Sequence, residues 1–396
     1  MARVAADPSP SRRPVAPVPG SPGQHNAITD VPGVLVGQVQ LAARPYLTGV
    51  TVVYLPEMSV TGVDQRGGAP ATHETDLLSP LNSNPGVNAI QLGGSSLYGL
   101  SAVSGIVRWL EERGEGVNLG PVGVAPIVPA ADIFDLGRGG DIKARTSPEW
   151  GWLAAAAASD GPVRQGNVGG GTGALAGDLK GGVGTASVYL GSDVYVGAIV
   201  LVNSYGSVVD PARGTLLGAG LGLGVEFAGL KPPTAAERRP AASGRGSGTP
   251  LHTVVAVVAT NAPLEKAAVT RMAGHAEDGI ARAISPSHTL YDGDTVFAVS
   301  TGAGSALRVN DPAAASRLNE IFDAGARALS RAIVRAVLCA EPVNGYTSYC
   351  ERFPSACQGL EALAAWRGGG QAQAVTARAL AEARRKLSLP PVPDGT

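Results

Sequence analysis

The stretch KPPTAAERRPAASGRGSGTPLHTVVAVVAT, residues 231–260, joins two segments of opposite character. Its first part, 231–250, is rich in Pro, Arg, Ser and Gly and has almost nothing to bury, which predicts a flexible surface linker. From Thr253 onward the chain is apolar at nearly every position, as expected for a strand that is covered on both faces. The chain therefore passes at Thr253 from an exposed loop directly into the core.

Elements on either side of this junction indicate a mixed α/β fold. Ser95 or Ser96 can cap a helix that runs to about Glu112, and a second helix is expected over 148–158. Asn261 is expected to cap a helix with Pro263 in its first turn. Apolar runs rich in β-branched residues predict strands over 34–39, 49–55, 87–92, 122–128, 185–190, 194–202 and 292–301. Further helices are expected over 312–339 and near 360–387.

Length and composition describe a globular, turn-rich protein. With about 100 to 200 residues per domain, a chain of 396 residues could form one large domain or two small ones. Hydrophobic residues make up 44% and charged residues 16%, so a large core can form, and 55 glycines indicate many tight turns. We expect one domain over 27–340, followed by a helical C-terminal extension and tail over 341–396.

Charge and hydropathy argue against two kinds of partner. The formal net charge is −1, and no run of like charges is long enough to attract a phosphate backbone, so nucleic acid is not expected. No stretch of 18 apolar residues occurs, so a membrane partner is not expected either. Residues 1–26 lack the continuous apolar segment of a secretory signal, which predicts a disordered tail on a cytoplasmic protein.

Several residue types that often hold ligands lack the required spacing. Cys339, Cys350 and Cys357 are odd in number and have no Cys-x-x-Cys pair, so in the cytoplasm we expect no structural disulfide. The five histidines show no metal-ligand spacing, so no metal is expected. The glycine cluster 166–184 lacks the Gly-Lys-Ser/Thr ending of a phosphate-binding loop, and close backbone packing is its expected use. We therefore predict no cofactor.

The junction at Thr253 offers one specific chemistry. A Thr hydroxyl is a poor nucleophile until a base removes its proton. If the bond between His252 and Thr253 is cut, the new α-amino group, with a pKa of about 8, lies within reach of the hydroxyl of the same residue. The alternative is that Thr253 merely begins a β-branched strand.

Seven motifs, in order between residues 28 and 301, decide between these alternatives. They are ITDVPGVLVG, VDQRGGAPATHETDLL, NAIQLGGSSLYGL, GNVGGGTGALAGDLKGGVGTAS, LVNSYGSVVD, TVVAVVATNAPL and DGDTVFAVST. Together they resemble the L-aminopeptidase/D-esterase family of self-processing hydrolases, which includes β-peptidyl aminopeptidases and the nylon-oligomer hydrolase. The resemblance implies a four-layer α/β/β/α sandwich with antiparallel sheets, and homotetramers of processed heterodimers.

The same resemblance implies roles for individual residues. Thr253 aligns with the nucleophile, so cleavage is expected after His252. Asn203, at the end of an apolar strand, aligns with the oxyanion-hole Asn, whose neutral NH2 can meet a developing negative oxygen. Its alternative role is to satisfy the backbone of a turn. At Phe134 the nylon-oligomer hydrolase has a tyrosine, so a hydroxyl contact to substrate would be missing here.

Three charged residues complete the predicted site. Lys180 matches a lysine near the nucleophile in the nylon-oligomer hydrolase, where a cation could lower the pKa of the amine; its alternative is a solvated loop lysine. Asp292 and Asp294 match that enzyme's Asp-x-Asp pair. Residues two apart on a strand share a face, so both carboxylates are expected to hold the new Thr253 amine. The alternative is that Asp292-Gly293-Asp294 forms only a turn.

The predicted function is hydrolysis of an amide or peptide bond, in a small peptide or amide substrate, through an acyl-enzyme on Thr253. A second hypothesis is acyl transfer of the ornithine acetyltransferase type, in which an amine rather than water takes the acyl group. A third is a non-catalytic binding or structural protein that keeps the fold without cutting itself.

Overall fold

The computed structural model describes residues 17–238, 251–368 and 373–387. One long strand, β2 (Thr48–Gln65), connects its two sheets. The first half of β2 pairs with β1 (Leu35–Leu41) and β4 (Val87–Gly93), while its second half pairs with β13 (Thr295–Ser300). A register shift after Tyr54 separates the two halves, so a single strand passes from one sheet into the other.

The second sheet carries the junction predicted from the sequence, and its strand order is β10, β11, β12, β13, β2. The strands β10, β11 and β12 span Gly182–Tyr189, Tyr195–Asn203 and Thr253–Thr260. In the first sheet, β1, β2 and β4 are joined by β3 (Thr72–His73), β7 (Ala130–Asp132) and β14 (Gln373–Ala374). Most neighbours are antiparallel, as expected, but the pairs β12–β13, β4–β7 and β1–β14 are parallel.

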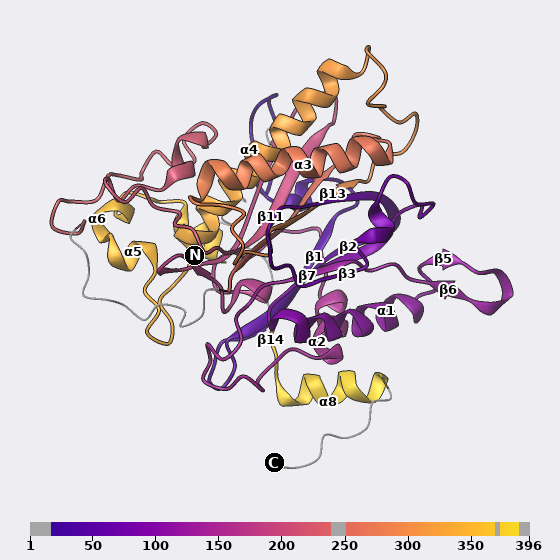
Figure 1. Ribbon diagram of the computed structural model, residues 1–396, viewed down its shortest axis with the longest axis horizontal. Coiled ribbons are helices and arrows are strands. Elements are labelled where there is room, and N and C mark those ends of the chain that lie inside the picture. Colours follow the sequence, from indigo (N-terminus) through magenta and orange to yellow (C-terminus); the bar gives the residue numbers. More distant parts are fainter. Residues whose placement is uncertain (1–16, 239–250, 369–372, 388–396) are drawn as a thin grey trace, which may run out of the picture.

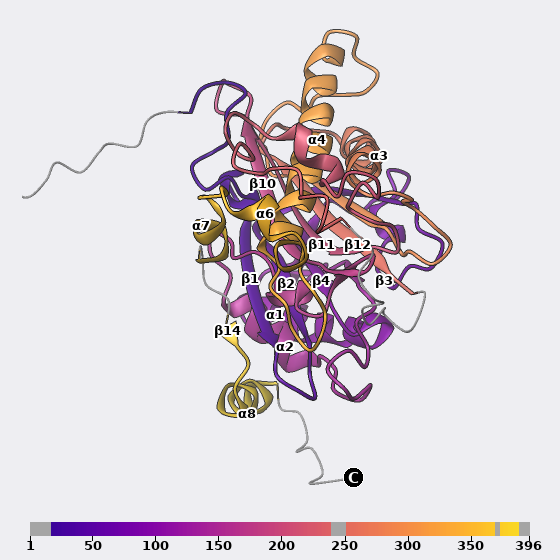
Figure 2. The same ribbon diagram turned by 90° about the vertical axis from the view of Figure 1, so that its left-hand side faces the viewer.

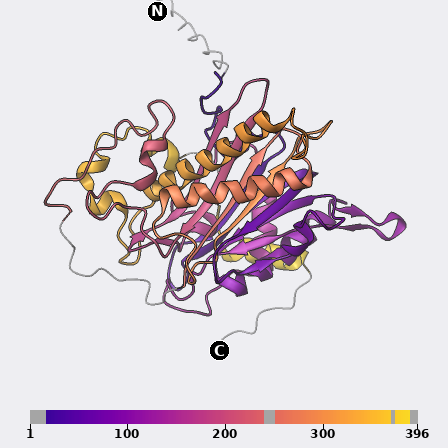
Figure 3. The ribbon, with the colours of Figure 1, turned by 45° about the horizontal axis from the view of Figure 1, so that its top comes forward.

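Helices cover the outer face of each sheet, which gives four layers (Figure 1). The helices α3 (Lys266–Ala283) and α4 (Ala315–Cys339) pack on the second sheet. The helices α1 (Val103–Glu111) and α2 (Pro148–Ala156) pack on the first. Each of these two contacts has its own apolar core, and a third apolar core fills the space between the sheets. Figures 2 and 3 show the same α/β/β/α order from other sides, which confirms the predicted sandwich.

The position of β12 in the sheet accounts for its unbroken run of apolar residues. Val255, Val257 and Ala259 enter the core between the sheets, and Val254, Ala256 and Val258 face α3 and α4. Because both faces are covered, every position from Thr253 to Thr260 is buried.

Shorter elements complete the described chain. The 3-10 helices are Ile28–Asp30, Asp76–Leu78, Ser96–Ala102, Gly120–Val122, Gly169–Gly171 and Leu217–Leu221. Two small hairpins pair β5 (Val117–Asn118) with β6 (Val124–Ala125), and β8 (Leu175–Ala176) with β9 (Leu179–Lys180). The C-terminal helices are α5 (Tyr349–Arg352), α6 (Pro354–Cys357), α7 (Leu363–Gly368) and α8 (Ala377–Lys386). Within the described ranges, no helix has both the length and the apolar character needed to cross a bilayer.

Two sequence expectations about local structure were wrong. The run 122–128 forms only the two-residue β6 of a hairpin that projects from the body, since Pro121 and Pro126 lack the N–H groups that a longer ladder needs (Figure 1). Asn261 does not cap α3, which begins at Lys266. Its side chain instead accepts a hydrogen bond from Tyr195 N and donates one to Asp193 O, so it closes the β10–β11 turn against the end of β12.

Three segments are more ordered than the sequence indicated. Residues 17–26 of the expected tail are placed, with Gly20 N donating to Tyr189 O at the edge of β10. Residues 231–238 of the expected linker pack near α6, where Lys231 N donates to Ala356 O; 239–250 lie outside the described residues. Cys350 and Cys357 form a disulfide, contrary to expectation, because adjacent helices α5 and α6 bring their Cα atoms to 5.6 Å.

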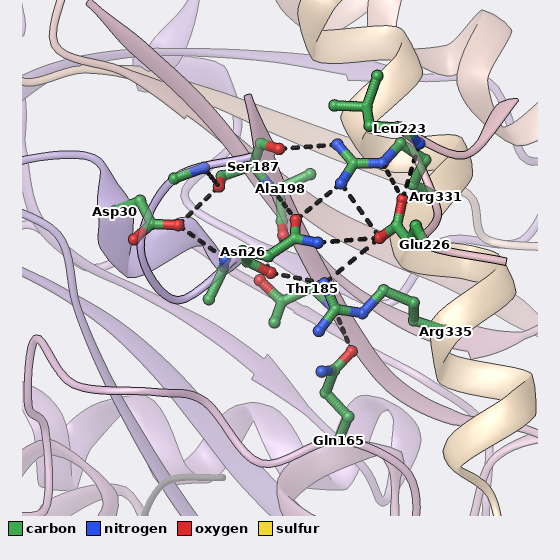
Figure 4. A network of polar contacts seen from close by, with 12 residues as sticks. Asn26, Asp30, Gln165, Thr185, Ser187, Ala198, Leu223, Glu226, Arg331 and Arg335 are labelled. Atoms are coloured by element: carbon green, nitrogen blue, oxygen red, sulfur yellow. Dashed lines mark hydrogen bonds and ion pairs between the residues drawn. The ribbon is translucent and has the colours of Figure 1, made fainter. Parts of the chain in front are cut away.

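A buried polar network links parts of the chain on both sides of Thr253 (Figure 4). Glu226, which precedes Thr253, accepts hydrogen bonds from Arg331 Nε at 2.6 Å and Nη2 at 3.1 Å. Arg331 also donates to Asn26 Oδ1 and to Ser187 O, both at 2.7 Å. Arg335 donates to Asn26 O at 2.7 Å. The N-terminal segment, β10, the Glu226 loop and α4 are therefore fixed to one another.

Candidate active site

The last residue of β11 and the first residue of β12 form the centre of the site. Asn203 and Thr253 are register partners in this antiparallel pair, and their exposed fractions are 0% and 3%. The chain leaves the sheet after Asn203 and enters it again at Thr253. The sheet register thus places an amide side chain directly beside a hydroxyl, although nearly fifty residues of sequence separate them.

Two donors meet the carbonyl group that precedes Thr253. The Thr253 hydroxyl donates to His252 O, and Gly293 N donates to the same oxygen at 3.2 Å. A Cβ at position 293 would lie 2.9 Å from Thr253 Oγ1 and 2.7 Å from Ala69 O, so only glycine lets this turn come so close. The His252 carbonyl is therefore polarised by a backbone N–H and has a hydroxyl oxygen beside it.

Hydrogen bonds orient the side chain of Asn203. Its Oδ1 accepts from Arg138 Nη1 at 2.5 Å and from Leu175 N at 3.0 Å. Its Nδ2 donates to Phe134 O at 3.3 Å. Because the oxygen has two donors, the network fixes which end of the amide is the NH2, and that group has a second hydrogen to offer. Phe134 thus contacts Asn203 through its backbone carbonyl, and its half-buried ring brings no hydroxyl.

Arg138 was not predicted from the sequence, yet its charge acts on several residues of the site. It is 6% exposed and also donates to Gly173 O at 2.7 Å. Burial lowers the pKa of Arg138 to about 10, while the charge of Asp135 opposes that shift. Burial and then the charge of Arg138 lower the pKa of His252 to about 4, so this histidine is neutral at pH 7. A lone arginine in a glycine-rich run has no pattern that marks it in advance.

Lys180 is completely buried rather than a solvated loop residue. Its Nζ donates to Gly181 O at 2.7 Å and to Gly171 O at 3.3 Å. Burial first, and the charge of Arg138 second, hold the pKa of Lys180 well below its usual range, and Asp135 opposes both. The buried position therefore works against the charged form of Lys180.

Asp292 and Asp294 lie in the turn before β13, which begins at Thr295, so the expectation that they share a strand face was wrong. Asp292 Oδ1 accepts from Tyr205 N at 2.9 Å, just after β11. Asp294 Oδ1 accepts from Val254 N at 2.8 Å, in β12. The two carboxylates anchor the turn to different strands, and only Asp294 contacts the chain next to Thr253.

Two tyrosines that the sequence did not single out flank the same junction. The Tyr205 ring lies 5.3 Å from the ring of Tyr291 and 5.9 Å from that of His252. Both tyrosines are nearly half exposed, at 43% and 45%. An aromatic surface therefore borders the bond between His252 and Thr253.

Comparisons with known proteins identify the family of the chain. The model of peptidase family S58 matches residues 26–350. An uncharacterized aminopeptidase of Mycobacterium leprae is 47% identical, over 84% of this chain and 95% of that protein. A 6-aminohexanoate-oligomer endohydrolase of Kocuria sp. is 32% identical, over 71% of this chain and 76% of that protein.

The fold has solved counterparts as well. The structure of an L-aminopeptidase D-Ala-esterase/amidase from Ochrobactrum anthropi, described as a variant of the Ntn hydrolase fold, matches with a TM-score of 0.64. The match covers 94% of this chain and 97% of that one at 23% identity. The family model and the sequence relatives confirm the family resemblance inferred from the motifs. The chain is a peptide hydrolase that belongs to peptidase family S58.

Proposed function

We propose that this protein cuts itself between His252 and Thr253 and then uses Thr253, as a new N-terminal residue, to hydrolyse amide bonds. The observation that carries the proposal is the position of the Thr253 hydroxyl against the carbonyl of the preceding residue, at the start of a buried strand. Gly293 N–H, a donor to the same carbonyl oxygen, would stabilise the negative charge that forms there during attack.

Maturation would proceed by transfer of an acyl group from nitrogen to oxygen. Thr253 Oγ1 attacks the His252 carbonyl carbon, the carbon–nitrogen bond breaks, and the hydroxyl proton passes to the leaving nitrogen. The result is an ester between His252 and Thr253 and a new α-amine on Thr253. Water then hydrolyses the ester, which leaves a carboxylate on His252 and restores the hydroxyl.

In the mature enzyme the α-amine of Thr253 would act as the base. It accepts the hydroxyl proton as Oγ1 attacks the substrate carbonyl, and that proton then passes to the leaving amine of the substrate. Asn203 Nδ2 would donate to the oxyanion, because Arg138 and Leu175 already occupy its Oδ1. Water releases the acyl group. The similarity to an aminopeptidase and to a 6-aminohexanoate-oligomer endohydrolase supports a small peptide or amide as substrate.

Intact mass spectrometry of freshly purified protein tests the proposal. We expect two fragments, 1–252 and 253–396, and N-terminal sequencing of the smaller should give Thr-Val-Val-Ala. Thr253→Ala should stay uncut and inactive, while Thr253→Ser should still mature because it keeps a hydroxyl in the same place. Fragments cut within 231–248 would instead indicate ordinary loop proteolysis, and an intact but active chain would overturn the nucleophile assignment.

A further inference from the structure

One histidine holds Asp294 through two separate donors. His288 N donates to Asp294 Oδ2 at 3.0 Å, and His288 Nδ1 lies 2.8 Å from the same oxygen. Because a carboxylate accepts hydrogen bonds, this contact requires the hydrogen on Nδ1. The other oxygen, Oδ1, is held by Val254 N at 2.8 Å. Each oxygen of Asp294 therefore has a defined partner, and the side chain, 1% exposed, has a single orientation.

The backbone of His288 makes this double contact possible. Its φ is +56°, a left-handed conformation that costs energy for most residues other than glycine and asparagine. In that conformation both the backbone N–H and the imidazole meet one carboxylate oxygen. Strained residues of this kind cluster at functional sites, where the surrounding structure holds them in place.

The surroundings of the imidazole are acidic. Glu277, on α3, is fully buried, and its Oε2 lies 3.7 Å from His288 Nδ1. Burial first, and the charge of Asp294 second, hold the pKa of Glu277 well above its usual range. Asp64 and Arg66 of the β2 end and Asp278 of α3 also act on Glu277. Among these acidic groups, Asp294 is the one within hydrogen-bond distance of the ring.

We infer that His288 is a positioning residue for the reaction: it fixes one oxygen of Asp294, so that the other is aimed at the start of β12, where the amine of the cut Thr253 forms. The inference rests on the proposed function, because that amine exists only after cleavage. His288 need not touch the substrate. His288 orients the carboxylate of Asp294, and that carboxylate holds the Thr253 amine.

Two substitutions at His288 distinguish the contribution of the imidazole from that of the backbone N–H. Both His288→Asn and His288→Gly tolerate a positive φ, but only Asn places an N–H where Nδ1 now lies. In processed enzyme, assayed with a p-nitroanilide of a small amino acid, His288→Gly should lower kcat by about 10- to 100-fold with little change in KM, the expected effect of a misplaced catalytic group. His288→Asn should restore most of the lost rate. His275→Asn, on α3 with its ring against Phe322, is the matched control and should behave like the parent enzyme.

A double-mutant cycle with Asp294→Asn supplies the decisive readout. If His288 acts through Asp294, His288→Gly should cost nothing further in the Asp294→Asn background, whereas a purely structural role would lower the rate equally in both. Equal losses in both backgrounds, or a wild-type rate for His288→Gly alone, would overturn the inference while leaving the proposed function intact. Failure of the proposed function itself would be visible separately, as uncut parent protein or as an active Thr253→Ala variant.

Discussion

Arg138 Nη1 donates to Asn203 Oδ1 at 2.5 Å, and this contact decides which way the Asn203 amide faces. An amide is nearly symmetric in shape, so its function as a donor depends on what occupies its oxygen. Here a buried guanidinium and Leu175 N occupy that oxygen, and the NH2 is left on the other side. The proposed oxyanion donor is thus oriented before any substrate binds.

Replacement of Asn203 by Ala should lower the turnover of already processed enzyme by roughly 10²- to 10³-fold, the usual loss for one oxyanion donor. The measurement is kcat on the isolated two-fragment protein, since maturation is expected to slow as well. Unchanged turnover in a folded Asn203→Ala variant would place the oxyanion donor elsewhere, with Gly293 N–H as the next candidate.

Arg138→Met should reduce kcat by about 10- to 100-fold, because a misoriented Asn203 amide no longer meets the oxyanion. Methionine keeps most of the buried aliphatic volume and removes the two hydrogen bonds of Nη1. Arg145→Met is the matched control, since Arg145 lies over the ring of Tyr98 rather than at Asn203. Equal rates for the two variants would show that Leu175 N alone is sufficient to orient Asn203.

The sequence predicts those parts of the molecule that depend on local patterns. The unbroken apolar run from Thr253 predicts a strand with two covered faces, and β12 has them. The position of Asn203 at the end of an apolar run is likewise correct, and the sheet register then places it opposite Thr253. The order of the layers could be expected only from the resemblance to a family, because periodicity does not say which helix covers which sheet.

The parts that could not be predicted depend on contacts between distant segments. Arg138 is buried and donates hydrogen bonds to residues 35 and 65 positions away, and nothing in its own stretch of sequence indicates these contacts. Asn26 lies in a composition typical of a disordered tail, yet it is fixed by Arg331 and Arg335, which are 305 and 309 residues away. Asp292 and Asp294 precede β13, which begins at Thr295, so the spacing rule for a strand does not apply to them, and they bind different strands.

The acidic limb of the rate profile should respond to Asp294. A carboxylate beside an ammonium favours the charged form, so Asp294 is expected to raise the pKa of the Thr253 amine. Asp294→Asn should therefore move the acidic limb of kcat/KM to lower pH by about one unit, besides lowering the rate. Asp292→Asn should move it less, because that carboxylate binds Tyr205 N and Thr289 instead. An unmoved limb at wild-type rate for Asp294→Asn would mean that 292–294 is only a turn.

The remaining prediction concerns stability and the ion pair that spans the proposed cut. Glu226 belongs to the N-terminal fragment and Arg331 and Arg335 to the C-terminal one, and all three side chains are at most 3% exposed. Burial alone would raise the pKa of Glu226, but the hydrogen bonds and charges of the two arginines outweigh it and lower that pKa. Because the folded-state pKa is depressed, the stabilisation is present above the unfolded-state value of about 4.3 and is lost as the pH falls through the folded-state value.

Glu226→Gln should therefore cost about 3 to 5 kcal/mol of unfolding free energy at pH 7, because it leaves two buried guanidinium groups without a carboxylate. Urea unfolding of the uncut Thr253→Ala chain measures this without dissociation of fragments. Glu320→Gln, on the exposed face of the same α4, should leave the urea midpoint nearly unchanged. The loss of unfolding free energy caused by Glu226→Gln should shrink as the pH falls below the unfolded-state value of about 4.3 and toward the lower folded-state pKa of Glu226. A loss that is equally large at pH 7 and pH 3 would show that the glutamine disturbs packing rather than charge.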